Sequence, residues 1–269
     1  MIRLETLEFL DIVAYVREKY GINLEKKKVL IECRLKSELE RCGMSSFREY
    51  MQAVKSDKSG QMAGEMINRL TTNYTYFMRE SKHFDYIRET ILPAVTAKNK
   101  ADYRVWCAGC ASGEECYTLA MLFQDFMQES SSTMRVHLTA TDICESALEQ
   151  ARRGIYPIKE LGNLPKRWQE QYCAVKDGKS FEIKKILKDM IQFKSQNLME
   201  PEDIRKKYDL ILCRNVMIYF DAASKKTMIK RLENSLRPGG YLIVGLAEVL
   251  PREFAALEFV GSAIYRKPA

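Results

Sequence analysis

One stretch of the chain, residues 103–121, constrains the fold more than any other. It runs from an apolar strand pattern through a glycine-containing turn straight into an amphipathic helix pattern. A parallel α/β sheet presents a nucleotide-like ligand to free backbone amides in this way. A second strand pattern, residues 136–142, ends on Asp142, where an acid can accept hydrogen bonds from a ribose diol. Together the two segments predict a cofactor site in a doubly wound sheet.

The composition indicates an ordinary globular protein. The chain has 269 residues, 46% of them hydrophobic, which allows one substantial core and a smaller appended domain. No apolar run approaches the roughly twenty residues of a membrane helix, and acids interrupt the N-terminal segment where a signal peptide would be apolar. We expect a cytoplasmic protein without membrane insertion, whose eight cysteines are reduced thiols.

Residues 1–90 carry the 3.6-residue apolar periodicity of helices and predict a small N-terminal helical domain. Within it, residues 25–41 are basic, and Lys27, Arg34 and Arg41 recur every seven residues along one helix face. A solvated charged face is the simplest interpretation. The net charge of +7 favours an acidic partner but does not identify one.

Residues 91–269 alternate between strand and helix patterns, which predicts a second domain built on a doubly wound α/β sheet. The segment 155–195, rich in Gly, Pro and Lys, interrupts this alternation and predicts a small antiparallel β insertion with strands at 181–187 and 190–193. The remaining expected elements are a strand at 208–214, a helix at 222–236, a turn at 237–240, a strand at 241–245 and a final pair at 254–260 and 263–266.

The glycine turn departs from the dinucleotide pattern Gly-x-Gly-x-x-Gly, because Cys107 stands where the first glycine should be. A third strand is followed by Arg214 and Asn215, and a Pro-Gly-Gly turn precedes a fourth. With Asp142, these features fit a sheet that binds S-adenosylmethionine better than one that binds a nicotinamide cofactor.

At these positions the sequence resembles the chemotaxis receptor methyltransferases (CheR type), soluble bacterial enzymes that esterify glutamate side chains of methyl-accepting chemoreceptors. The family's Thr-Thr-Asn-x-Thr-x-Phe-Phe-Arg box stands here as Thr71-Thr72-Asn73-Tyr74-Thr75-Tyr76-Phe77-Met78-Arg79. Its other motifs are the Gly-Cys-x-Ser-Gly-Glu-Glu turn at Gly109 to Glu115, the Asn-Leu pair at 197–198 and the Cys-Arg-Asn-Val-x-Ile-Tyr-Phe segment at Cys213 to Phe220. The departures are Met78 for the second Phe and Cys116 for the usual Pro.

The resemblance implies methyl transfer from S-adenosylmethionine to chemoreceptor glutamates, with glutamate methyl esters and S-adenosylhomocysteine as products. The cofactor contacts that it implies are Asn73, Thr75, Arg79, Gly109, Glu115, Asp142, Asn197, Leu198, Cys213, Arg214 and Asn215. It places Arg79, Arg214 and Tyr219 nearest the chemistry. We expect one arginine to position the substrate and the other to bind the cofactor's own carboxylate, and the sequence does not assign the two roles.

Simpler interpretations exist for several of these residues. Asp142 can cap the helix that follows it, and Glu114 and Glu115 suit a helix's first turn without any function. Tyr219 and Phe220 can be core aromatics beyond the strand. Three nearby cysteines, at positions 107, 110 and 116, invite a metal or redox interpretation, but both histidines are distant in sequence and we expect no metal.

Two other functions stay open. One is a nucleic acid methyltransferase, although the turn after the third strand lacks the Asn/Asp-Pro-Pro-Tyr pattern of adenine amino methylation. The other is a catalytically silent receptor-binding module on the same fold. If the resemblance holds, Lys26, Lys27, Arg34 and Arg41 are the expected dock for the acidic cytoplasmic helices of chemoreceptors, the protein is a monomer, and nucleic acid is not a partner.

Overall fold

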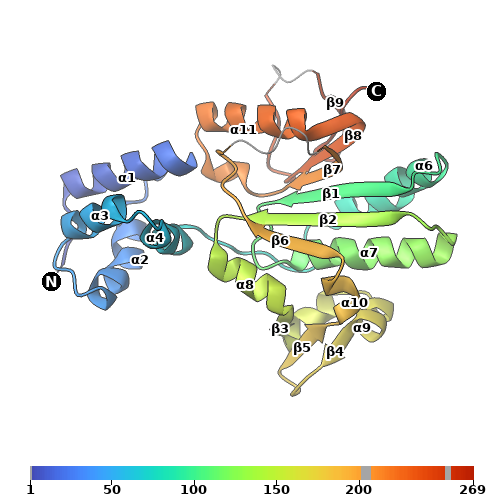
Figure 1. Cartoon of the computed structure of the whole chain (residues 1–269), viewed down its shortest axis with the longest axis horizontal. Helices are drawn as coiled ribbons and strands as arrows, with labels where there is room; N and C mark the ends of the chain where they lie inside the picture. Colours follow the sequence, from blue (N-terminus) through green and yellow to red (C-terminus); the bar gives the residue numbers. More distant parts are fainter. Residues whose placement is uncertain (1, 201–206, 252–255) are drawn as a thin grey trace.

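The computed structural model describes residues 2–200, 207–251 and 256–269, and comprises a helical part, a central sheet and a small second sheet (Figure 1). The helical part contains α1 (Thr6–Tyr20), α2 (Lys28–Arg41), α3 (Phe47–Ser56) and α4 (Gln61–Leu70). A capping box between Glu5 and Glu8 starts α1, and the Ser46 hydroxyl accepts a hydrogen bond from Glu49 N to start α3. Apolar side chains between Leu4 and Leu70 form one buried cluster, so these helices share a core of their own.

The next helical segments pack with the sheet instead. They are α5 (Lys82–Tyr86), a π-helical turn (Ile87–Ile91) and α6 (Leu92–Thr96). Phe77, Phe84 and Ile91 belong to a buried cluster that also contains strand residues. Helical periodicity continues to about residue 90, which is why the sequence predicts a boundary there. From the packing we propose a boundary between residues 70 and 77.

The central sheet has the strand order β6-β2-β1-β7-β8-β10-β9. Its strands are β1 (Asp102–Ala108), β2 (Arg135–Asp142), β6 (Ile191–Ser195), β7 (Tyr208–Cys213), β8 (Leu236–Val244), β9 (Glu258–Gly261) and β10 (Ile264–Arg266). The first five pair in parallel, whereas β10 is antiparallel to both β8 and β9. The chain proceeds from β1 to β2 on one side and later to β7 on the other, so a topological switch point lies between β1 and β7.

Helices cover both faces of this sheet, as the predicted doubly wound fold requires. Alternate residues of β1 point to opposite faces. Val105 and Cys107 join the cluster that contains α7 (Glu114–Ser130), whereas Trp106 and Ala108 join the cluster that contains α11 (Ala222–Ser235). Burial on both faces explains why the strand patterns read as apolar runs.

The second sheet, of order β3-β5-β4, is the predicted antiparallel insertion, and it follows α8 (Glu145–Arg153). The insertion consists of β3 (Ile155–Pro157), a 3-10 helix (Ile158–Asn163), α9 (Lys166–Tyr172), β4 (Cys173–Val175), β5 (Ser180–Ile183) and α10 (Lys185–Lys188). The expected strand at 190–193 was wrongly assigned to this insertion, because β6 pairs in parallel with β2 in the central sheet. The expected strand at 181–187 ends early, because α10 begins at Lys185.

The last part of the chain follows the expected alternation with one difference. The Pro-Gly-Gly segment expected as a turn lies within β8, where the ladder to β7 shifts register between Tyr208 and Leu210. The first residues of the expected final pair, 254 and 255, lie outside the described residues. Among the helices of the described ranges, none is long and apolar enough to cross a membrane.

The helical part lies against the carboxyl ends of the central strands (Figure 1). Arg17 Nε donates to Asp221 Oδ2 at 2.7 Å, and Asn23 N donates to Tyr219 O at 2.8 Å. Ile22 and Phe220 form an isolated antiparallel bridge. These contacts place helical-domain residues next to the switch point of the sheet.

Candidate functional site

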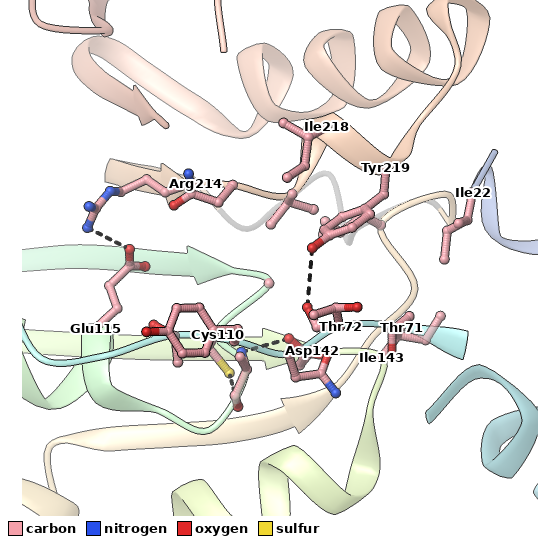
Figure 2. A pocket seen from close by; sticks show the side chains of 18 of the residues that line it. Ile22, Thr71, Thr72, Cys110, Glu115, Asp142, Ile143, Arg214, Ile218 and Tyr219 are labelled. Atoms are coloured by element: carbon pink, nitrogen blue, oxygen red, sulfur yellow. Dashed lines mark hydrogen bonds and ion pairs between the residues drawn. The ribbon is translucent and has the colours of Figure 1, made fainter. Parts of the chain in front are cut away.

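A pocket of about 290 Å³ lies where β1, β2 and β7 end, at the switch point. Open α/β sheets bind their ligands at this position. The pocket is lined by parts of residues 20–24, at the end of α1 and just after it, and by residues 70–76, the end of α4 and the linker that follows. The β1–α7 turn and the segments 196–198 and 214–220 complete much of the remaining lining. Side chains from these segments face one another across it (Figure 2).

The turn between β1 and α7 forms the floor of the pocket. Gly109 has φ +84°, and a Cβ there would lie 2.4 Å from Val216 Cγ2. Gly113, the N-cap of α7, has φ +94°, and a Cβ there would lie 2.8 Å from Ala151 Cβ. The chain therefore needs glycine at both positions to bring the amino end of α7 to the pocket.

Asp142 ends β2 beside this turn and is buried. Its Oδ2 accepts a hydrogen bond from Ala111 N at 2.7 Å, and its Oδ1 accepts one from Cys144 N at 2.9 Å. Burial raises the pKa of Asp142, while these backbone donors oppose that shift. The carboxylate lines the pocket and holds Cys144, the N-cap residue of α8, through its backbone N–H, but it does not itself cap that helix. Each of its oxygens keeps capacity for a further hydrogen bond.

Arg214, just after β7, is a deeply enclosed cation of the pocket, with its side chain 2% exposed. Its Nη1 donates to Glu115 Oε2 at 2.9 Å (Figure 2), and its Nη2 donates to Glu80 Oε2 at 3.1 Å and to the Arg79 carbonyl. Its guanidinium also lies 5.2 Å from the centre of the Phe84 ring. The guanidinium is thus held by two carboxylates, a carbonyl and a ring.

Arg79 lies in a different environment in the same pocket. Its Nη1 donates to the Tyr74 carbonyl at 2.9 Å, and its guanidinium lies 5.9 Å from the centre of the Tyr76 ring. Within the described ranges Arg79 forms no ion pair with a carboxylate. It is therefore a pocket cation whose charge is available to an anionic ligand.

Tyr219 lies opposite the linker. Its hydroxyl donates to the Thr72 carbonyl at 3.3 Å across the pocket (Figure 2), and the residue is 38% exposed. It is therefore not the core aromatic of the simpler interpretation. Phe220, its neighbour, packs against the cluster beneath α11.

The structure brings nearly all of the sequence-predicted residues to this pocket. Those that line it are Asn73, Thr75, Arg79, Gly109, Glu115, Asp142, Asn197, Leu198, Arg214, Asn215 and Tyr219. Cys213 is not among them, because its side chain is fully buried in the core and its backbone pairs with Val244.

Two enclosed acids behind the pocket wall, Glu80 and Glu248, are absent from the sequence-predicted set. Glu80 accepts hydrogen bonds from Arg214, from Asn215 Nδ2 at 3.2 Å and from the backbone N–H of Leu246. Glu248 accepts hydrogen bonds from Asn215 N at 2.8 Å and Gly245 N at 2.7 Å. Glu80 could have been found from the sequence because it directly follows Arg79. Nothing in the sequence marks Glu248 as a partner of Asn215, which follows β7.

The three cysteines beneath the turn are free thiols. Cys116 hydrogen-bonds with Cys107 and Cys110, and burial raises the pKa of Cys116 well above its usual value. Over residues 2–200, 207–251 and 256–269, no group of three His, Cys, Asp or Glu side chains is arranged to hold a metal ion.

Comparison with known proteins agrees with this architecture. The family model described as "CheR methyltransferase, SAM binding domain" matches residues 73–266, and "CheR methyltransferase, all-alpha domain" matches residues 7–71. With the switch-point pocket, the first match defines an S-adenosylmethionine-dependent methyltransferase. Since the two matches cover nearly the whole chain, the protein belongs to the CheR methyltransferase family.

Individual relatives are similar to this chain over most of their length. A chemotaxis protein methyltransferase of Borreliella burgdorferi is 41% identical over 97% of this chain and 94% of its own length. Chemotaxis protein methyltransferase 1 of Vibrio cholerae is 32% identical over 90% of this chain and 89% of its own, and that of Pseudomonas aeruginosa is 30% identical over 94% of each.

The pocket's own residues fit S-adenosylmethionine. The Asp142 carboxylate can accept from a ribose diol, and the floor of the pocket needs glycine for close backbone approach. Tyr20 and Ile22 provide apolar surface. The end of α1 and the residues after it therefore supply part of the pocket wall, and the sequence analysis did not single out Tyr20 or Ile22 for this role.

Proposed function

We propose that this chain transfers a methyl group from S-adenosylmethionine to glutamate side-chain carboxylates of methyl-accepting chemoreceptors, giving glutamate methyl esters and S-adenosylhomocysteine. The observation that carries this proposal is Arg79, a pocket cation without a carboxylate partner among the described residues. The names of the relatives, chemotaxis protein methyltransferases, support the choice of chemoreceptors.

The bound cofactor supplies an activated methyl group on a sulfonium. A glutamate carboxylate is already ionised at neutral pH, so the protein need not provide a general base. Its task is to align the carboxylate with the methyl group, which contributes about 7–11 kcal/mol in favourable cases. This suits a pocket whose walls provide hydrogen bonds and charge rather than a histidine.

We assign different roles to the two arginines. Arg79 receives the substrate carboxylate, because its guanidinium has no competing carboxylate in contact with it among the described residues. Arg214 keeps the pocket wall in place, because Glu80 and Glu115 already occupy its donors. Tyr219 lies opposite and orients the incoming side chain through its hydroxyl. Of the remaining pocket residues, Asn73, Thr75, Gly109, Asp142, Asn197, Leu198 and Asn215 are the proposed cofactor contacts.

The receptor dock that we propose near α2 contains fewer residues than the sequence predicted. Arg34 donates to the carbonyls of Arg69, Leu70 and Thr71 at the end of α4, and Arg41 pairs with Glu38 and Glu65. Both therefore have partners inside the helical domain. Lys26 and Lys27 are exposed just before α2, and we propose them as the residues that meet acidic receptor helices.

Methyl transfer to a purified receptor cytoplasmic domain tests this proposal. With S-adenosylmethionine labelled in its methyl group, the wild type should produce label that base releases as methanol, the signature of a carboxyl ester. A receptor with its acceptor glutamates replaced by glutamine should gain none. Arg79→Gln should lower kcat/KM on the order of a hundredfold, the effect of misplacing a reacting group.

The other outcomes favour the alternatives. Base-stable label on DNA or RNA would contradict the proposal and favour a nucleic acid methyltransferase. Cofactor binding without transfer to any receptor domain would favour the silent receptor-binding module.

A further inference from the structure

Glu80 connects three separate segments behind the pocket wall. Its carboxylate accepts from Arg214 Nη2 at 3.1 Å, from Asn215 Nδ2 at 3.2 Å and from Leu246 N at 3.3 Å. Arg214 and Asn215 follow β7, Leu246 follows β8, and Glu80 itself follows Arg79 in the linker region. One side chain therefore fixes the ends of two central strands against the segment that carries the free pocket cation.

The backbone at Glu80 is held in an unfavourable conformation. Its φ is +55°, in the left-handed region that a glutamate rarely adopts. Met78, two residues earlier, has φ +62°. The Arg79 carbonyl between them accepts a hydrogen bond from Arg214 Nη2, so the bent backbone and the carboxylate engage the same guanidinium. Strain of this kind persists where the surroundings determine the conformation.

The charges around Arg214 do not cancel. Glu80 and Glu115 bring two carboxylates to a single arginine, so the acids outnumber the cation that they contact. Burial raises the pKa of Glu115, and the charge of Arg214 opposes that shift. His83 Nδ1 lies 3.5 Å from Glu80 Oε2, but burial lowers the pKa of His83 and keeps the ring neutral at neutral pH. Burial raises the pKa of Glu80, but the charge of Arg214 and the hydrogen bonds from Arg214, Asn215 and Leu246 together lower the pKa below its ordinary value, so the carboxylate is charged.

We infer that Glu80 is a positioning residue of the cofactor pocket, and that its negative charge raises the affinity of the pocket for the cationic S-adenosylmethionine relative to its affinity for the product S-adenosylhomocysteine, whose sulfur is uncharged. The inference rests on the proposed placement of the cofactor in this pocket. The two ligands differ by one methyl group and one positive charge at sulfur. A charge near the pocket therefore changes their affinities by different factors, whereas a loss of rigidity alone changes both by the same factor.

Isothermal titration of both ligands to purified wild type, Glu80→Gln and Glu38→Gln tests this inference. Glu80→Gln keeps the size of the side chain and removes its charge. We expect the ratio of S-adenosylmethionine affinity to S-adenosylhomocysteine affinity to fall on the order of three- to tenfold, as Coulomb attraction at intermediate dielectric constants implies. Glu38→Gln removes a buried carboxylate of the helical domain that does not line the pocket, and it should leave the ratio unchanged.

A second variant separates the charge from the backbone. Glu80→Gly removes the same charge while relieving the left-handed strain, so it should lower the ratio even if the glutamine variant does not fold. Equal loss of both affinities, or no change in either, would overturn the inference. Those results would leave methyl ester formation by the wild type intact, so failure here is distinct from failure of the proposed function.

Discussion

Two ion networks with buried centres, one in each domain, have opposite arrangements of charge. In the helical domain one acid, Glu38, meets two arginines, with Arg41 Nη2 and Arg69 Nη2 each 2.5 Å from its carboxylate. In the pocket one cation, Arg214, meets Glu80 and Glu115. The central side chain is 2% exposed in both cases.

The two networks also differ in the exposure of the side chains that surround Glu38 and Arg214. Arg41 is 56% exposed and also pairs with Glu65, so the helical network is balanced in charge and open to water. The partners of Arg214 are more enclosed, and Glu115 lines the pocket. A buried charge needs partners in either place. Acids outnumber the cation in the pocket network, which lies beside the ligand site, whereas the charges of the helical network balance. We therefore expect both networks to contribute to stability, and only the pocket network to affect ligand binding.

The largest effect should follow from Arg214→Met, which leaves two carboxylates buried without their cation. Breaking such a network costs about 3–5 kcal/mol of unfolding free energy, measurable by urea denaturation. Arg79→Met is the matched control: it should change stability by no more than about 0.5 kcal/mol and still abolish most methyl transfer. Equal stability of the two variants would show that Arg214 is not a structural residue.

Glu38→Gln should have the next largest effect, a loss of about 1–3 kcal/mol, because Arg41 and Arg69 each lose a charged hydrogen-bond acceptor. Cofactor affinity should not change. If Glu38→Gln instead weakened S-adenosylhomocysteine binding and left stability normal, the helical network would affect ligand binding rather than stability, contrary to this account.

The same glutamate predicts a pH dependence of stability. Hydrogen bonds from Arg41 hold the pKa of Glu38 at about 2, below its ordinary value of 4.5. Since the folded-state pKa is the lower one, this stabilisation is complete above pH 4.5 and is lost as the pH falls toward 2. The loss of unfolding free energy between about pH 6 and pH 3, measured by urea denaturation, should be smaller for Glu38→Gln than for wild type. Equal losses would exclude Glu38 as the source.

Arg34→Ala should destabilise the helical domain by about 1–2 kcal/mol, because the guanidinium satisfies carbonyls at the end of α4. Lys27→Ala, at the N-cap of α2, the helix that carries Arg34, is the control and should leave the denaturation midpoint unchanged. If the two variants behaved alike, the contacts of Arg34 would contribute nothing to stability.

The smallest effect on stability should come from Lys26→Glu with Lys27→Glu, within about 0.5 kcal/mol for exposed side chains. Its effect should appear in the KM for the receptor, which should rise several-fold at low salt and less at high salt, since salt screens exposed charges. Unchanged KM at low salt would place the receptor dock elsewhere.

The sequence predicted the parts of the fold that depend on local pattern. The β1–turn–α7 unit and the acid ending β2 are visible because strand, glycine and helix signals adjoin one another. The assignment of residues 190–193 failed because Ile191 pairs with Leu138, and a parallel partner so far away leaves no local signal.

The site shows the same limit. Its motif residues could be named from the sequence, but the partners that decide their roles could not. Arg214 is occupied because Glu80 and Glu115 converge on it from elements distant in sequence. Arg34 caps α4, which no helical periodicity within α2 could reveal.

One measurement tests the central claim, that the switch-point pocket is the cofactor site, most directly. It is isothermal titration of S-adenosylhomocysteine to the wild type and to Asp142→Asn, with thermal denaturation of both proteins to confirm folding. We predict saturable binding by the wild type and binding weaker by about tenfold or more in the folded variant, because an amide in place of the carboxylate is not a charged acceptor. Binding unaffected by the substitution, or no binding to the wild type, would contradict the claim.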